Sequence, residues 1–121
     1  MQQNSHISEI LKFLTELRTN NNREWFTAHK QHYEALRASW LNDLQQLITI
    51  MSSYDQSLCN IQAKDCAYRI YRDIRFSPDK TPYKTHFGAV LGEKGRRTQK
   101  SCYYIHLEPG ASGLYAGLWC P

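Results

Sequence analysis

The spacing of apolar residues changes from a helical period to a strand period near Ala67. Before that point, one stripe with i, i+3, i+4, i+7 spacing predicts an amphipathic helix over residues 6–19. A second stripe, free of Gly and Pro, predicts one long helix over residues 23–52. Between the two, Asn20 and Asn21 favour a break, because Asn side chains compete for backbone hydrogen bonds, and Asn22 is placed to cap the second helix.

After Ala67, β-branched and aromatic residues predict four β-strands, over residues 67–76, 85–91, 101–108 and 113–119. Gly and Pro punctuate the connections between them. Two N-terminal helices followed by strands predict an α+β fold, in which the helices pack on a largely antiparallel sheet. A length of 121 residues fits one domain over residues 1–121.

Period two divides the predicted strands between two faces. In the first strand, Tyr68, Ile70, Ile74 and Phe76 share one face, interrupted by Arg72. If this apolar face covers the helices, the opposite face carries charged side chains and one imidazole. That face is either a functional surface or a merely solvated one, because antiparallel sheets commonly leave one face in water. Its predicted members are Arg69, Asp73, Arg75, His106 and Glu108.

Composition excludes several classes of protein. No apolar run approaches the roughly 20 residues that span a bilayer, and the first residues lack a signal-peptide pattern. We therefore expect a cytoplasmic protein without a membrane partner, whose four cysteines are free and mostly buried thiols. The chain has no C-x-x-C pair, P-loop or G-x-G-x-x-G motif, and no ligand completes the pair His29 and His32, so we expect no resident metal or cofactor.

The positive charge is concentrated in the middle of the chain. Between Arg69 and Lys100 there are nine Lys and Arg residues against three acidic residues. This imbalance indicates an anionic partner, although a solvated basic face fits equally well. Within the stretch, Pro78 and Pro82 stiffen a loop that would lose little entropy on holding an anion. The predicted ligand-binding residues are Arg69, Arg72, Arg75, Lys80, Tyr83 and Lys84.

The leading hypothesis is a domain that binds an anionic small molecule, which could bear a phosphate. An enzymatic version would use Asp73, His86 or His106 as the acid–base group, because imidazole titrates near neutral pH and a neighbouring Arg tunes Asp. A nucleic-acid-binding module is the alternative, since basic and aromatic residues interleave. A third reading is a protein-interaction domain whose charges form internal ion pairs. Oligomeric state is not specified by the sequence.

Arg72 differs from Arg69 and Arg75 in the face of the predicted strand on which it lies. Its position on the apolar face predicts a structural arginine that pairs with Asp65 or Asp79. Arg69 and Arg75 point the other way and are predicted to be the functional arginines.

Two segments carry a resemblance to a known family. They are FLTEL…NNREWF…HK…YE within residues 13–34, and KDC…RIYRDIRFSPDKTPYKT within residues 64–85. The chain resembles, over nearly all its length, the uncharacterised bacterial family called domain of unknown function 2461. The resemblance implies no known activity, substrate or cofactor. It does imply that the chain corresponds to the N-terminal part of a longer family domain, and that Pro78 replaces a Lys common in other members.

Overall fold

In the computed structural model, which describes residues 2–98 and 101–118, the first apolar stripe forms helix α1 (Gln2–Thr19). Ile10, Leu14 and Leu17 of this stripe are fully buried. The helix ends where the Asn20 side chain donates to the carbonyl oxygen of Glu16 at 2.9 Å, which satisfies one of its terminal carbonyls. The predicted first helix is confirmed, but it begins at Gln2 instead of residue 6.

The predicted long helix is broken at His29 into α2 (Arg23–Ala28) and α3 (Lys30–Met51). As predicted, the Asn22 side chain caps α2 by accepting a hydrogen bond from the Trp25 N–H. At the break, the His29 ring stacks on Trp25, and its Nδ1 lies 2.7 Å from the Trp25 carbonyl oxygen. The break lies in the backbone of His29, whose φ of −112° and ψ of 13° are not helical, although its N–H still donates to the Trp25 carbonyl oxygen at 3.2 Å. The prediction of one continuous helix was therefore wrong.

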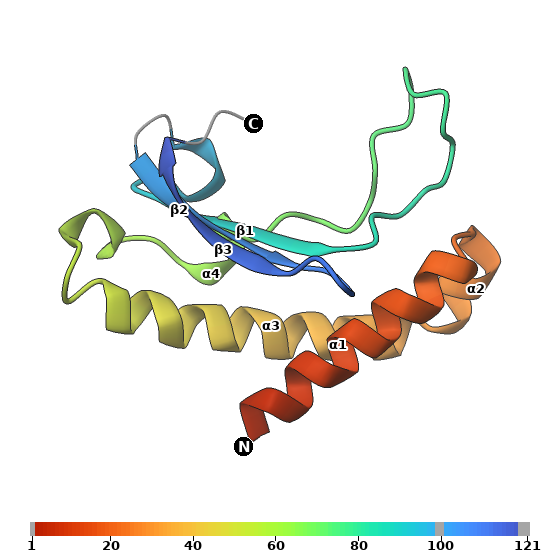
Figure 1. The fold of residues 1–121 in the computed structure, drawn as a ribbon, viewed down its shortest axis with the longest axis horizontal. Helices are drawn as coiled ribbons and strands as arrows, with labels where there is room; N and C mark the ends of the chain where they lie inside the picture. Colours follow the sequence, from red (N-terminus) through yellow and green to blue (C-terminus); the bar gives the residue numbers. More distant parts are fainter. Residues whose placement is uncertain (1, 99–100, 119–121) are drawn as a thin grey trace.

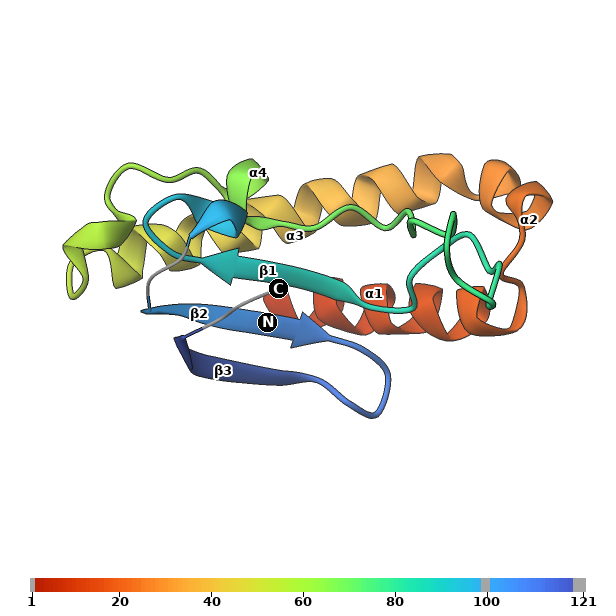
Figure 2. The same cartoon turned by 90° about the horizontal axis from the view of Figure 1, so that it is seen from above.

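Three strands, β1 (Phe87–Leu91), β2 (Ser101–Leu107) and β3 (Gly113–Leu118), form an antiparallel sheet in the order β1-β2-β3. Helices α1 and α3 lie against one face of it (Figures 1 and 2). In the core between these layers, the Phe87 ring contacts Tyr33 and Trp40 of α3. The predicted α+β class, with helices packed on an antiparallel sheet, is confirmed.

The predicted strand over residues 67–76 does not form. Residues 67–72 do run antiparallel beside the chain leading into β1, but only through isolated bridges, Ala67 with Ala89 and Tyr71 with Tyr83. Pro82 has no N–H to donate, so the ladder is interrupted there, and residues 73–81 leave it as a loop. This loop projects from the rest of the fold in Figure 1, and Phe76 within it is 92% exposed. The expected apolar face therefore ends before Phe76.

Three short helical segments complete the fold: η1 (Gln56–Leu58), α4 (Ala63–Cys66) and η2 (Gly95–Arg97). Cys66 is a buried free thiol, as predicted, and Cys102 is buried too, whereas Cys59 is free and exposed, and Cys120 lies outside the described residues. In the described part of the chain, none of the helices combines the length and the apolar character that a membrane span requires.

Alkaline pH is expected to destabilise the fold through Cys66. Burial, reinforced by the Asp65 charge, raises the pKa of this thiol from 9.0 to about 12. Between these values the unfolded chain loses the proton while the folded protein keeps it, so the free energy of unfolding falls as pH rises, by up to about 1.4 kcal/mol per pH unit. Denaturant titrations from about pH 8 to pH 11 measure this slope. Cys66→Ala should reduce it, and an unchanged slope in that variant would contradict the assignment.

Candidate anion-binding site

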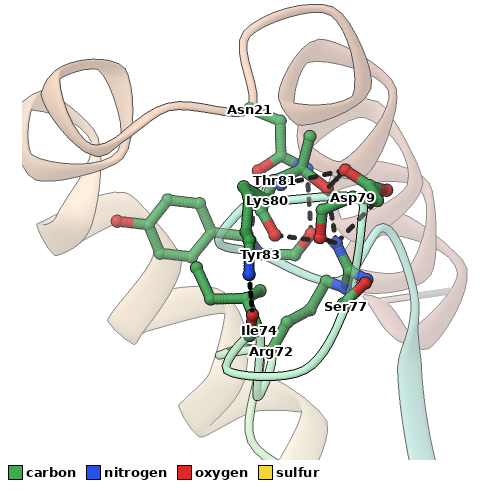
Figure 3. Close-up of polar contacts among 8 residues, drawn as sticks. All are labelled: Asn21, Arg72, Ile74, Ser77, Asp79, Lys80, Thr81 and Tyr83. Atoms are coloured by element: carbon green, nitrogen blue, oxygen red, sulfur yellow. Dashed lines mark hydrogen bonds and ion pairs between the residues drawn. The ribbon is translucent and has the colours of Figure 1, made fainter.

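The loop over residues 73–81 is held closed by Arg72 (Figure 3). The Arg72 guanidinium donates to the carbonyl and hydroxyl oxygens of Thr81 at 2.8 and 2.6 Å, and lies 3.3 Å from the Asp79 carboxylate. Hydrogen bonds from the Thr81 N–H and hydroxyl, with a smaller effect of Arg72, lower the pKa of Asp79. The predicted pair with Asp79 is present. Arg72 is 25% exposed, however, and lies under the loop instead of within the apolar core.

Two more predicted ligand-binding residues have structural partners in the loop. Tyr83 is buried and stacks on Phe26 at 4.1 Å, and its backbone N–H and carbonyl both bond to the Asn21 side chain, at 3.1 and 2.8 Å. Lys80 donates from Nζ to the Ile74 carbonyl oxygen at 2.6 Å, as Figure 3 shows. The Asn21 side chain thus anchors the backbone of Tyr83, just after the loop, to the segment before α2, whereas Lys80 makes a contact within the loop.

Arg75 and Asp73 form an ion pair with each other. The guanidinium of Arg75 donates to both carboxylate oxygens of Asp73, at 3.0 and 2.9 Å, and lies over the Phe76 ring. The hydrogen bonds from Arg75 lower the pKa of Asp73 to about 2. Asp73 therefore stays ionised at neutral pH and is a weak base. The predicted functional Arg75 and the predicted catalytic Asp73 form one exposed pair.

Arg69 and Lys84 meet Arg96 at an open cleft of about 390 Å³. Lys84 Nζ lies 5.2 Å from the centre of the Tyr68 ring, and the Arg69 guanidinium lies 5.6 Å from that of Tyr71. Burial, followed by the charges of Arg69 and Arg96, lowers the pKa of Lys84. This basic cleft gathers positive charge from three separate segments. Its lining residues are Tyr68, Arg69, Tyr71, Arg72, Asp73, Lys84 and Arg96.

Arg96 was missed by sequence reasoning. It belongs to η2, and its guanidinium donates to the carbonyl oxygens of Lys64 and Ala67 at 2.9 and 2.8 Å. These bonds fix Arg96 beside Arg69, which follows Ala67 closely in the chain. Both partners are backbone carbonyls about 30 residues away, so no local motif marks Arg96 as part of the cleft.

The two predicted catalytic histidines come together on the sheet. The rings of His86 and His106 stack with centroids 4.5 Å apart. His106 bonds through Nε2 to Glu108 at 2.7 Å and through Nδ1 to the Tyr104 hydroxyl at 2.7 Å. We call His86, His106 and Glu108 the histidine cluster. Asp73 is not part of it, and lines the basic cleft instead.

A second cleft, of about 330 Å³, connects the histidine cluster with the loop. His86, Lys84, Arg18 and Arg72 are among its lining residues. Burial, followed by the charges of His106 and Lys84, lowers the pKa of His86. A neutral imidazole at a cleft wall can accept a proton, so His86 is the predicted acid–base residue that this geometry suits best.

Comparison with known proteins identifies the family of this chain but no activity or ligand. Residues 9–121 match the family described as "Conserved hypothetical protein (DUF2461)". No curated protein and no solved structure matches the chain. The family match covers the helices, the loop and the sheet, and agrees with the resemblance carried by residues 13–34 and 64–85. The chain belongs to the DUF2461 family.

Proposed function

We propose that the protein binds a phosphate-bearing anion in the basic cleft. The observation that supports the proposal is the convergence of Arg69, Lys84 and Arg96 at one cleft, where burial, followed by the repulsion of the two arginines, lowers the pKa of Lys84. Among the described residues, neither Arg69 nor Lys84 forms an ion pair with a carboxylate. An anion in the cleft would relieve this repulsion. Guanidinium forks with an adjacent ammonium suit phosphate oxygens.

The shape and pairing of the charges support a small ligand over the two alternatives. The cations line one open cleft of about 390 Å³, a volume of small-molecule size, whereas single-stranded nucleic acid would be expected to follow an extended basic groove. Internal pairing accounts for Arg72 and Arg75, which have carboxylate partners, but not for Arg69 and Lys84. Of the predicted ligand-binding residues, Arg69, Arg72 and Lys84 line the cleft, whereas Arg75, Lys80 and Tyr83 do not.

Arg69→Gln is expected to weaken binding of inorganic phosphate or pyrophosphate about 10- to 100-fold, because a hydrogen bond to a charged group contributes about 1.5–3 kcal/mol. Lys12→Gln is the control: it removes one positive charge at a different cleft and should change the affinity little. Isothermal titration calorimetry of both variants and of the parent protein measures the difference.

Two outcomes would contradict the proposal. One is the absence of phosphate and pyrophosphate binding in the parent protein. The other is an equal loss in Arg69→Gln and Lys12→Gln, which would indicate attraction to the overall charge. If a single-stranded oligonucleotide binds instead, with affinity that falls steeply as salt rises, the nucleic-acid alternative is favoured.

A further inference from the structure

Strand pairing assembles the histidine cluster on the face of the sheet that points away from the helices. Phe87 and Leu107 are register partners in β1 and β2, and both side chains are buried in the core. Because side chains alternate along a strand, His86 points to the opposite face. His106 and Glu108 flank Leu107 and point to that face too. The three side chains therefore meet where β1 begins and β2 ends, at the last register pair of the two strands.

The donor atoms of the cluster lie near the spacing that a metal ion requires. One atom from each of His86, His106 and Glu108 lies within 4.8 Å of the other two. Zinc with four ligands at about 2.0–2.2 Å holds its donor atoms about 3.4 Å apart. His106 Nε2 and Glu108 Oε1, at 2.7 Å, would separate slightly, and His86 would approach by side-chain rotation. No backbone movement is needed for shifts of about 1 Å.

Tyr104 holds His106 in a way that suits a metal ligand. A carboxylate only accepts hydrogen bonds, so in the neutral His106 ring Nε2 carries the proton toward Glu108 and Nδ1 accepts from the Tyr104 hydroxyl. When a metal binds Nε2, that proton leaves, Nδ1 takes up a proton, and the Tyr104 oxygen becomes the acceptor. A histidine ligand whose other ring nitrogen has a fixed partner is the usual arrangement at metal sites.

We propose that His86, His106 and Glu108 bind one transition-metal cation of the zinc class. Two imidazoles with one carboxylate favour such a cation over Mg²⁺ or Ca²⁺, which prefer all-oxygen ligands. The charged groups facing the cluster are Lys84, which acts on His86, and Arg18, 3.9 Å from Glu108. The positive charges of Lys84 and Arg18 repel a metal dication. They therefore favour an anion as the fourth ligand, which could enter from the second cleft, because His86 lines that cleft. This site does not depend on anion binding in the basic cleft.

The test is calorimetric titration of the full chain with Zn²⁺, in a Cys59→Ser, Cys120→Ser background so that these thiols do not compete. We expect one Zn²⁺ per chain. His86→Asn and Glu108→Gln should each weaken binding more than about 100-fold, and Tyr104→Phe about 10-fold, since loss of a ligand's supporting partner costs about 10- to 100-fold. His32→Asn is the matched control, because His32 packs edge-on against Phe13 and lines a different cleft.

Nitrogen-15 chemical shifts of the imidazoles provide a readout that does not depend on the folding of a variant. With one equivalent of Zn²⁺, His86 and His106 should both shift to metal-bound values, with the His106 proton moving to Nδ1. The proposal is overturned if the parent binds no stoichiometric Zn²⁺, if these two imidazoles do not respond, or if His32→Asn loses as much affinity as His86→Asn. Arg69→Gln should leave the affinity for Zn²⁺ unchanged, which separates this result from the anion test.

Discussion

Gly95→Ala is expected to lower the free energy of unfolding by about 2–5 kcal/mol, the largest effect of any substitution considered for this protein. Gly95 begins η2 with a φ of +59°, a left-handed conformation that costs an L-residue about 1–2 kcal/mol. A Cβ at this position would also lie 2.4 Å from the Asp65 carbonyl oxygen, so η2 and α4 would have to separate. Forcing such overpacked atoms apart typically costs about 1–3 kcal/mol more.

Gly110→Ala separates these two contributions. Gly110 also has a positive φ, of +80°, but a Cβ there meets nothing within 4 Å. This variant should therefore lose only the conformational part, about 1–2 kcal/mol. Chemical denaturation of both variants provides the comparison. Equal losses would show that the contact between Gly95 and Asp65 does not constrain the fold. Gly95→Ala should also weaken phosphate binding, because Arg96 would lose its bonds to Lys64 and Ala67.

Arg72→Ala is expected to lower the free energy of unfolding by about 2–3 kcal/mol. The guanidinium holds both the carbonyl and the hydroxyl of Thr81 and approaches Ser77, so its removal frees the loop over residues 73–81 from the chain beneath it. Thr81 is half-buried, and its carbonyl oxygen would lose the charged group that donates a hydrogen bond to it. Arg72→Lys should recover only part of the loss, because an ammonium cannot reproduce the planar fork. Denaturant melts measure the global effect, and hydrogen exchange of residues 73–81 measures the local one.

Arg75→Ala is the control for Arg72. Arg75 is 75% exposed and bonds only to neighbouring Asp73 among the described side chains, so its removal should leave the melt unchanged. The reverse pattern, with Arg75→Ala unfolding the protein and Arg72→Ala leaving it intact, would show that the assignment of the two arginines is inverted.

The elements that depend on local periodicity were predictable from the sequence. The stripe of α1, the Asn22 cap and the antiparallel strands from Phe87 onward follow from side chains a few residues apart. The failures have identifiable causes. The backbone of His29 departs from helical geometry and ends one helix, and Pro82, which has no N–H to donate, interrupts the pairing of residues 67–76. In both places a single residue overrode an otherwise continuous pattern.

For the candidate sites, the sequence determined which residue types were present, and only the tertiary structure decided their partners. Charge concentration indicated a basic region, and alternation set Arg72 apart, but only the fold tied Arg75 to Asp73 and brought Lys84 and Arg69 to one cleft. The histidine cluster likewise needed the register of β1 on β2 to bring His86 to His106. The physical reason is that alternation and periodicity fix the direction of a side chain, whereas its partner comes from a segment brought near by burial of the core.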